Sequence, residues 1–244
     1  MAIHHRLRAE HWFSHESAAL VWRLPVLRVP RDTHLRQATR ASGHRDRTVA
    51  RHVGVVPGQH QAVVDGIPVT DLTWTMVDCA LSLSGCAALV VADAALAAGA
   101  DRAVASELVA ALGRRSGTAR ARDVLAVADA GAESPGETLV RAALLASGLP
   151  PPVTQVPVET RHGRCWADLG YPQWRVVLEY DGRSKYVDRD TLVREKRRHD
   201  AIVEAGFQVL RITKEDLPHP RALLPRLLPL LPAIPLTPRP HFTR

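Results

Sequence analysis

The sequence contains little cysteine, little lysine and few aromatic residues. Three of its 244 residues are cysteine, at Cys79, Cys86 and Cys165, and they form no Cys-x-x-Cys pair. Neither a disulfide framework nor a structural zinc site is therefore indicated. Cys79 and Cys86 lie seven residues apart in an Ala/Leu-rich stretch, which predicts that both thiols fill the core from one face of one helix.

Long apolar runs are also missing. No window approaches the roughly 18 apolar residues that a membrane-spanning helix needs, and residues 1–6 lack the apolar stretch of a signal peptide. A composition of 46% hydrophobic and 23% charged residues, with a mean hydropathy of -0.09, is typical of a soluble globular protein. We therefore expect a cytoplasmic protein with no membrane partner, built as one large domain or two small ones.

Positive charge is carried almost entirely by arginine and is concentrated at the two ends of the chain. The net charge is +7, and only 3 of the 32 basic residues are lysine. Residues 1–53 carry 10 arginines against 4 acidic residues, residues 54–133 carry 5 against 9, and residues 134–244 carry 17 basic residues against 12. Arginine and lysine supply most non-specific affinity for nucleic acids, so this distribution favours polyanion binding by both ends. A generic solvated surface is the alternative.

The N-terminal region has the pattern of a small α+β module. Residues 14–22 begin with a serine suited to an N-cap and continue with good helix formers. The arginine-rich residues 31–51 have little apolar periodicity and are predicted to form turns. Residues 53–56 and 61–69 are typical of short strands, and an Asp-Gly pair within the second of them is a hairpin signal.

Two stretches of this region carry a family resemblance. Ser-His-Glu-Ser-Ala-Ala-Leu from Ser14 and Asp-Gly-Ile-Pro-Val-Thr from Asp65 resemble the AbiEi-like antitoxin N-terminal region. The resemblance implies a winged-helix-like module that binds nucleic acid, whereas the alternative is a small structural cap whose arginines serve solubility. The contacts expected from such a module come from Arg36, Arg40, Arg45 and Arg47.

A helical connector is predicted over residues 75–133. This segment is rich in Ala, Leu and Val, and its apolar positions recur at helical spacing. Asp78 and Asp93 lie fifteen residues apart in it and are not matched with a histidine or cysteine as a partner in chemistry. We interpret both as exposed helix charges, so this segment is not predicted to carry chemistry.

The C-terminal region gives the clearest pattern. Ser134 is followed by proline at the first helical position and by glutamate three residues after the cap, which predicts a helix to about residue 147. Three strands, a charged helix closed by Gly206 and a last strand follow, so the predicted order is αβββαβ. The strands are expected at residues 153–159, 164–170 and 175–181, the second helix at 189–204 and the last strand at 207–213.

Alternation along two of these strands brings acidic side chains to one face of the sheet. Asp168 belongs to the second strand, and Glu179 and Asp181 belong to the third. A turn centred near residues 172–173 places Asp168 opposite Val177, and the three carboxylates then share a face. Such carboxylates repel one another unless a cation lies among them, and Mg²⁺ accepts one or two carboxylates plus water, so the pattern predicts a metal site. The alternative is an ordinary hairpin with an apolar core face and a polar face in water.

The whole arrangement of this region resembles a known family. Glu137 on a helix, Asp168 on one strand, Glu-Tyr-Asp-Gly from Glu179 on the next, a basic helix and Val-Leu-Arg-Ile-Thr at residues 209–213 resemble the Vsr-like domain of the PD-(D/E)XK restriction-endonuclease fold. The resemblance implies that Asp168 and Glu179 ligate Mg²⁺ or Mn²⁺, with Asp181 alongside and Glu137 reaching in from the helix. Such a metal polarises the phosphodiester and lowers the pKa of a bound water.

Two departures from the family pattern bear on catalysis. Asp181 stands where the broader fold has a lysine, and Arg183 stands where relatives often have histidine, which leaves Lys185 to supply the missing cation. Glu137 has a competing role, because a glutamate three residues after Ser134 can close a capping box. The basic side chains of the second helix are interpreted as phosphate contacts or as a solvated face. They are Arg194, Lys196, Arg197 and Arg198.

The predicted molecule is an α+β or α/β protein whose function is metal-dependent hydrolysis of DNA, with RNA left open as a substrate and no organic cofactor. The rival hypothesis is a non-catalytic DNA-binding protein, such as an antitoxin-like transcriptional regulator, and the two departures favour it. The predicted parts are the winged-helix-like module at residues 1–74, the connector at 75–133, the αβββαβ endonuclease-fold domain at 134–220, and a proline-rich tail at 221–244 that is loose from residue 237.

Overall fold

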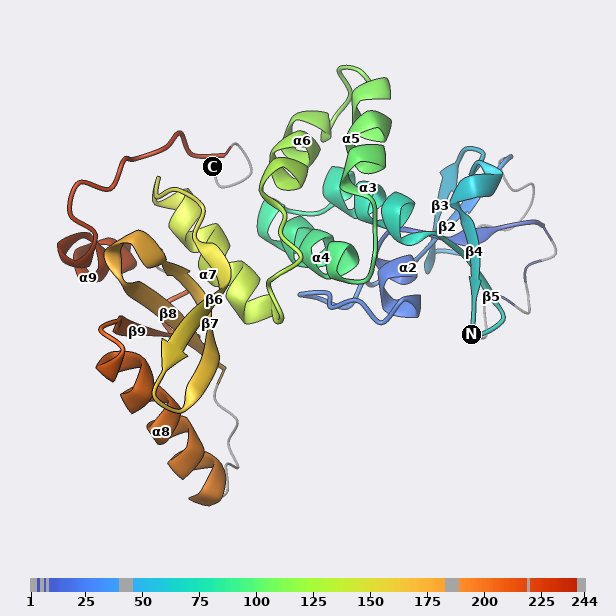
Figure 1. Cartoon of the computed structure of the whole chain (residues 1–244). Coiled ribbons are helices and arrows are strands. Elements are labelled where there is room, and N and C mark those ends of the chain that lie inside the picture. The colour runs from blue at the N-terminus through green and yellow to red at the C-terminus, as the bar shows by residue number, and fades with distance from the viewer. Residues whose placement is uncertain are drawn as a thin grey trace. The chain divides into compact units, whose positions relative to one another are not determined.

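The computed structural model describes residues 4, 7, 9–39, 46–182, 189–218 and 220–240. The chain divides into two compact units, Met1–Ala130 and Gly131–Arg244, and each combines helices with one mixed β-sheet (Figure 1). The prediction of an α+β protein is therefore confirmed at this level. Within the described ranges, no helix is long and apolar enough to cross a membrane.

The sheet of the first unit has the strand order β3-β2-β1-β5-β4. The central strand β1 pairs antiparallel with β2 and parallel with β5, and β2 pairs parallel with β3. The short helix α2 (His15–Val21) packs on this sheet through Ala18, which confirms the predicted helix. The strands are β1 (Trp12–Phe13), β2 (Thr33–Gln37), β3 (Val49–Val53), β4 (Gln61–Val64) and β5 (Ile67–Thr70).

The predicted hairpin between β4 and β5 is confirmed. Val64 pairs with Ile67, and the two residues between them, Asp65 and Gly66, both have positive φ angles of 50° and 77°. Two-residue turns with both φ angles positive match the twist of antiparallel strands, and Asp-Gly adopts them at low cost.

The prediction of turns over residues 31–51 is wrong, because β2 and part of β3 form there. The strand predicted at residues 53–56 is also wrong, since β3 ends at Val53. β2 and β3 lack the apolar alternation that identifies a strand from sequence. They carry Arg36 and two histidines, His34 and His52, at positions where a half-buried strand usually has apolar residues. These polar side chains have partners inside the unit, as described below.

Four helices follow the first sheet, and they correct two sequence-based interpretations. Cys79 and Cys86 lie on different helices, because Ser84 begins a new helix between them. Asp78 and Asp93 are not exposed charges, since each is 1% exposed. Arg36 binds Asp78, and the backbone N–H of Asp129 donates to Asp93 at 2.8 Å. The helices are α3 (Leu72–Ser82), α4 (Gly85–Ala97), α5 (Arg102–Ala111) and α6 (Thr118–Val127).

The second unit has the predicted order αβββαβ. Its sheet runs β6-β7-β8-β9, with β8 and β9 parallel and the other pairs antiparallel. Every predicted element of the αβββαβ pattern appears within a few residues of its expected bounds. The elements are α7 (Pro135–Ala146), β6 (Val153–Thr160), β7 (Gly163–Tyr171), β8 (Val176–Asp181), α8 (Arg189–Glu204) and β9 (Gln208–Thr213).

The register between β7 and β8 differs from the prediction by two residues. Gly170, not Asp168, pairs with Val177, and the last pair of the ladder joins Leu169 to Leu178. Continuing this register places Asp168 opposite Glu179. The shift arises at the turn, where the 3₁₀ helix η2 (Pro172–Trp174) is followed by Arg175 with a φ of 53°.

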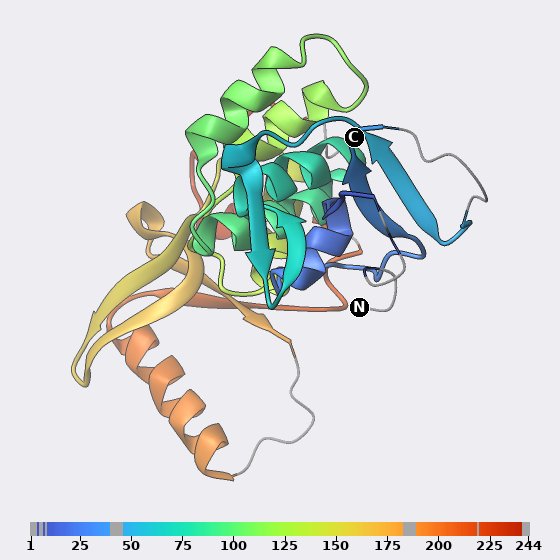
Figure 2. The same cartoon turned by 90° about the vertical axis from the view of Figure 1, so that its right-hand side faces the viewer.

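Each face of this sheet is covered by a helix. Val176 and Leu178 pack with α7 in one core, while Val177 packs with Ile202 of α8 in another. Figure 2 shows the long β6–β7 hairpin lying beside α8. The short helices η3 (Pro220–Leu223), α9 (Leu224–Leu227) and η4 (Leu228–Leu230) add buried leucines to the α7 side.

The predicted loose tail is attached at its start. The backbone N–H of Thr237 donates to the carbonyl of Gly148 at 2.8 Å, and the Thr237 hydroxyl donates to the carbonyl of Leu149 at 3.2 Å. The end of α7 therefore fixes this part of the tail, while residues 241–244 lie outside the described ranges.

Candidate functional site

Asp168 lies at the point where β7 and β8 separate. The ladder stops at Leu169, and the Asp168 carboxylate accepts a hydrogen bond through Oδ2 from the backbone N–H of Tyr180 at 2.8 Å. The carboxylate thus takes the place of a backbone carbonyl in the ladder. Burial raises the pKa of Asp168, and the bond from Tyr180 and the charge of Arg198 oppose this rise.

Glu179 is buried beside it on β8. Its residue exposure is 6%, and its Oε1 lies 2.8 Å from Nη2 of Arg198. Among the described residues, no hydrogen-bond donor is aligned with this oxygen, so the contact with Arg198 is an ion pair without hydrogen-bond geometry. Burial raises the pKa of Glu179, Arg198 opposes the rise, and the charge of Asp168 adds to it.

Arg198 of α8 connects the carboxylates to the helix. Its guanidinium also lies 3.2 Å from Oε2 of Glu195 and donates to the backbone carbonyl of Trp166 at 3.1 Å. Burial alone would lower the pKa of Arg198, but Glu179 and Glu195 outweigh it and raise the pKa. A fixed positive charge thus stands beside Glu179. From the sequence alone Arg198 is interpreted as a phosphate contact or as part of a solvated face, because nothing in the sequence relates it to a residue nineteen positions earlier.

The other predicted catalytic residues lie in different surroundings. Glu137 uses both carboxylate oxygens at the start of α7, where Oε1 accepts from the Ser134 hydroxyl at 2.7 Å and Oε2 accepts from the backbone N–H of Glu133 at 2.8 Å. Burial raises the pKa of Glu137, and the charge of Asp168 contributes to the rise, so the two groups sense each other. Asp181 is exposed at the end of β8. Lys185 lies outside the described residues.

These carboxylates do not form a compact set of three ligands. Within the described part of the chain, the one group of three or more candidate ligand side chains with atoms within 4.8 Å of one another is His15, His34 and His52. Asp168 and Glu179 nevertheless suit Mg²⁺, which binds proteins through one or two carboxylates and keeps several waters. Asp168 Oδ1 takes no part in the bond to Tyr180, and Glu179 Oε1 lacks an aligned donor, so each residue offers an oxygen.

A basic cleft adjoins this pair. Its volume is about 570 Å³, and it lies between the turn of the β6–β7 hairpin and α8. We call it the arginine cleft. Arg198 belongs both to the cleft and to the ion pair with Glu179. The sequence predicted contacts from α8 but missed the two arginines of the hairpin, because a turn gives no periodic signal. Five arginines line the arginine cleft: Arg161, Arg164, Arg194, Arg197 and Arg198.

Lys196 is exposed on α8 but does not line the arginine cleft. In the first unit, Arg36 points inward. Its Nε donates to Asp78 Oδ2 at 3.0 Å, its Nη2 also pairs with Asp78, and its guanidinium lies over the Trp74 ring at 5.4 Å. Arg36 is thus neutralised inside the fold. Arg47 is exposed, while Arg40 and Arg45 lie outside the described residues.

Comparison with known proteins identifies two relatives. Both are uncharacterized proteins of Mycobacterium tuberculosis, from strains CDC 1551 / Oshkosh and ATCC 25618 / H37Rv, and both are 32% identical to this chain over 158 residues. The match covers 63% of this chain and 58% of each relative, so the chain spans little more than half the length of these relatives. No family model matches the chain, and no solved structure matches it.

Proposed function

We propose that the second unit is a metal-dependent DNA endonuclease of the Vsr-like PD-(D/E)XK type. The observation that carries the proposal is the placement of Asp168 and Glu179 side by side on neighbouring strands, with Arg198 joining them to the arginine cleft. The order αβββαβ, with helices on both faces of the sheet, supports the same fold. Residues 1–74, within the first unit, are proposed as an AbiEi-like, winged-helix-like module that binds nucleic acid, and the protein is proposed to act on DNA in the cytoplasm.

The site residues divide the work of hydrolysis. Asp168 and Glu179 would hold Mg²⁺ or Mn²⁺, which supplies a Lewis acid and a water of lowered pKa at the phosphodiester. Arg194 and Arg197 bind backbone phosphates in the arginine cleft and bring the strand to the carboxylates. Arg198 keeps the charge of Glu179 balanced before metal binds, and its guanidinium can then turn to a phosphate oxygen.

The second candidate is a nucleic-acid-binding protein without cleavage, such as a transcriptional regulator. The commitment of both Glu137 oxygens to the start of α7 favours it, as does Asp181 at the position of the usual lysine. In that case the arginine cleft binds phosphates, and the carboxylates serve only to hold Arg198.

Nicking of supercoiled DNA separates the two candidates. The purified protein is incubated with supercoiled DNA, single-stranded DNA and RNA, with Mg²⁺, with Mn²⁺ or with EDTA. The nuclease proposal expects metal-dependent nicking that falls by about 100-fold or more in Asp168→Asn and Glu179→Gln. The matched control is Glu107→Gln, which removes an exposed carboxylate of α5 and leaves the rate unchanged.

Three results would count against the proposal that this site cleaves DNA. Tight, salt-sensitive binding with no cleavage under either metal supports the regulator. Nicking that survives both substitutions shows that another site or a contaminant cuts the DNA. Metal-dependent cleavage of RNA alone would keep the carboxylate site and change its substrate.

A further inference from the structure

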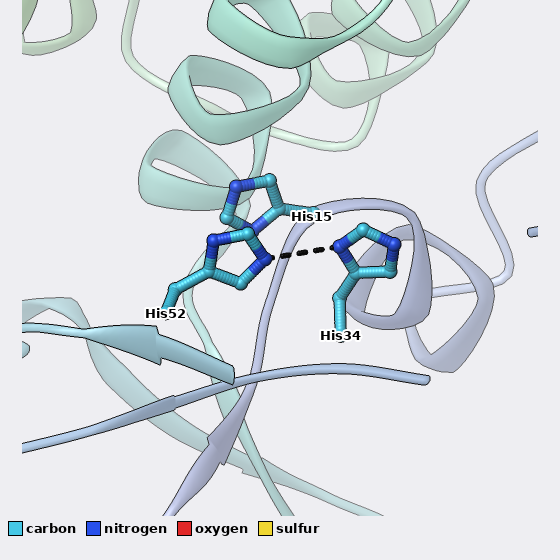
Figure 3. Close-up of side chains that lie close together, drawn as sticks. All are labelled: His15, His34 and His52. Carbon is cyan, nitrogen blue, oxygen red and sulfur yellow. Dashed lines mark hydrogen bonds between the residues drawn. The ribbon is translucent and has the colours of Figure 1, made fainter. Parts of the chain in front are cut away.

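Three histidines converge in the first unit, whereas Asp168 and Glu179 belong to the second (Figure 3). His15 begins helix α2, and His34 and His52 come from the neighbouring strands β2 and β3. The rings of His15 and His52 are stacked with centroids 3.8 Å apart, and Nδ1 of His34 lies 3.0 Å from Nε2 of His52. One ligand atom from each residue lies within 4.8 Å of the other two.

The backbone is strained where it presents His15. This residue has a φ of 53°, a conformation that is unfavourable for residues with a side chain and that persists where the surroundings or a function require it. The preceding Ser14 occupies the N-cap of α2 but makes no capping bond with its side chain. Its hydroxyl lies 3.0 Å from Nδ1 of His15 instead. A strained residue and a diverted cap thus both fix one imidazole.

A buried carboxylate supports the same ring. Asp78 Oδ2 lies 3.4 Å from Nδ1 of His15, and Asp78 is held in turn by Arg36. Histidine ligands in metal sites commonly direct the non-ligating nitrogen to a carboxylate, which fixes the tautomer and the ring orientation. Ser14 and Asp78 thus fix the His15 ring through Nδ1, which leaves Nε2 as its candidate ligand atom.

Burial affects two of the three imidazoles. Burial, with the nearby Arg36 and His34, lowers the pKa of His15 to about 3. Burial and the other two histidines likewise lower the pKa of His52 to about 4, although Asp78 opposes this change. A metal ion binds the neutral form of imidazole, whose unprotonated nitrogen carries a lone pair.

We propose that His15, His34 and His52 form a binding site for a Zn²⁺-class cation, with water as the fourth ligand. Zinc lies about 2.0–2.1 Å from imidazole nitrogen, so the ligand atoms of a tetrahedral site are roughly 3.4 Å apart. Nδ1 of His34 and Nε2 of His52, 3.0 Å apart, are within a few tenths of an ångström of this spacing. Metal binding would require the His15 ring to rotate towards the other two. It would also replace the His34–His52 hydrogen bond, so the ring that donates this bond would then carry its proton on its other nitrogen. Three imidazoles suit zinc and its neighbours in the first transition series better than Mg²⁺.

Zinc titration of the full-length protein without a histidine tag tests the site. The protein is stripped of metal, and Zn²⁺ binding is measured by calorimetry in excess Mg²⁺ and in the Asp168→Asn/Glu179→Gln background, which separates this site from the carboxylates. We expect one equivalent of tightly bound Zn²⁺, a higher melting temperature with zinc, and the visible absorption of tetrahedral cobalt when Co²⁺ replaces it.

Histidine variants assign the ligands. His34→Ala and His52→Ala should weaken zinc binding by about 100-fold or more, because loss of an outer-shell partner alone costs 10–100-fold. The matched control is His11→Ala, which breaks a second histidine pair, with Nε2 of His11 3.0 Å from Nδ1 of His4, outside the proposed site. X-ray absorption of the zinc-loaded wild-type protein reports imidazole ligands even if a variant does not fold. The proposal is overturned if wild type and His52→Ala bind zinc equally, or if only His11→Ala loses zinc binding. X-ray absorption without imidazole scattering would also overturn it.

Discussion

At Asp168, one carboxylate closes a β-ladder and also faces other charged groups. Its hydrogen bond from the Tyr180 N–H fixes the point where β7 and β8 separate. Burial raises the pKa of Asp168. Glu179 is in a similar electrostatic environment, since burial and the charge of Asp168 together raise its pKa. Functional residues are often carboxylates whose pKa is raised by their surroundings and which lie where they can bind a cation.

The substitution Asp168→Asn is therefore expected to stabilise the protein while it removes activity. The amide oxygen still accepts from Tyr180, and the buried charge is gone. Because the pKa of Asp168 is raised in the folded state, the penalty is present at neutral pH and disappears as the pH falls below the pKa of an unfolded aspartate, about 3.9. Urea unfolding should show a higher midpoint for the variant at pH 7 and no difference near pH 3. A lower urea midpoint for Asp168→Asn than for wild type at pH 7 would contradict the conclusion that the charge of Asp168 destabilises the folded state.

At the scale of elements, β7 and β8 position both carboxylates because their backbones approach closely at Gly170. A Cβ atom at this glycine would lie 2.6 Å from the carbonyl oxygen of Val176. Only glycine therefore allows the register that sets Asp168 opposite Glu179.

The substitution Gly170→Ala should destabilise the protein by about 1–3 kcal/mol and reduce nicking, since β7 must move away from β8. Gly58→Ala is the control, because nothing lies within 4 Å of the added atom there. Denaturant unfolding checks the stability and the nicking assay checks the site. Equal effects of the two substitutions would show that the close approach has no role.

The arginine cleft is a second element-scale feature, formed by α8 and the β6–β7 turn. Arg197→Ala should weaken binding to DNA of any sequence and lower the slope of log K against log salt by about 0.9. Arg122→Ala, in α6 of the first unit, is the control. Fluorescence anisotropy at several salt concentrations measures both. An unchanged slope for Arg197→Ala would place the DNA elsewhere.

The sequence predicted the second unit well because its signals are local. Ser134 caps α7, and Gly206, with a φ of 85°, ends α8. The register of β7 and β8 could not be predicted in detail, because a 3₁₀ turn and the positive φ of Arg175 move the turn centre by one residue. In the first unit the burial of Asp78 could not be predicted, because its partner Arg36 lies 42 residues away in the sequence.

At the scale of the whole molecule, the chain carries two separate centres of polar chemistry. Each unit has its own sheet and core, so neither needs the other to bury its apolar residues. The carboxylate pair and the arginine cleft belong to the second unit, and the three histidines belong to the first.

A fragment of residues 131–244 should consequently fold alone. Its unfolding in urea, followed by circular dichroism, is expected to be a single cooperative transition, and the fragment should retain metal-dependent nicking. A fragment without a cooperative transition would show that the second unit depends on the first.

The metal site at Asp168 and Glu179 is tested by counting the Mn²⁺ ions that the protein binds. Electron paramagnetic resonance counts them in titrations of wild type and variants. Mn²⁺ replaces Mg²⁺ at carboxylate sites and is detected without any assumption about the substrate. If Asp168 and Glu179 form the metal site, one bound Mn²⁺ disappears in both Asp168→Asn and Glu179→Gln and remains in Glu107→Gln. The same number of bound ions in all four proteins would contradict this assignment.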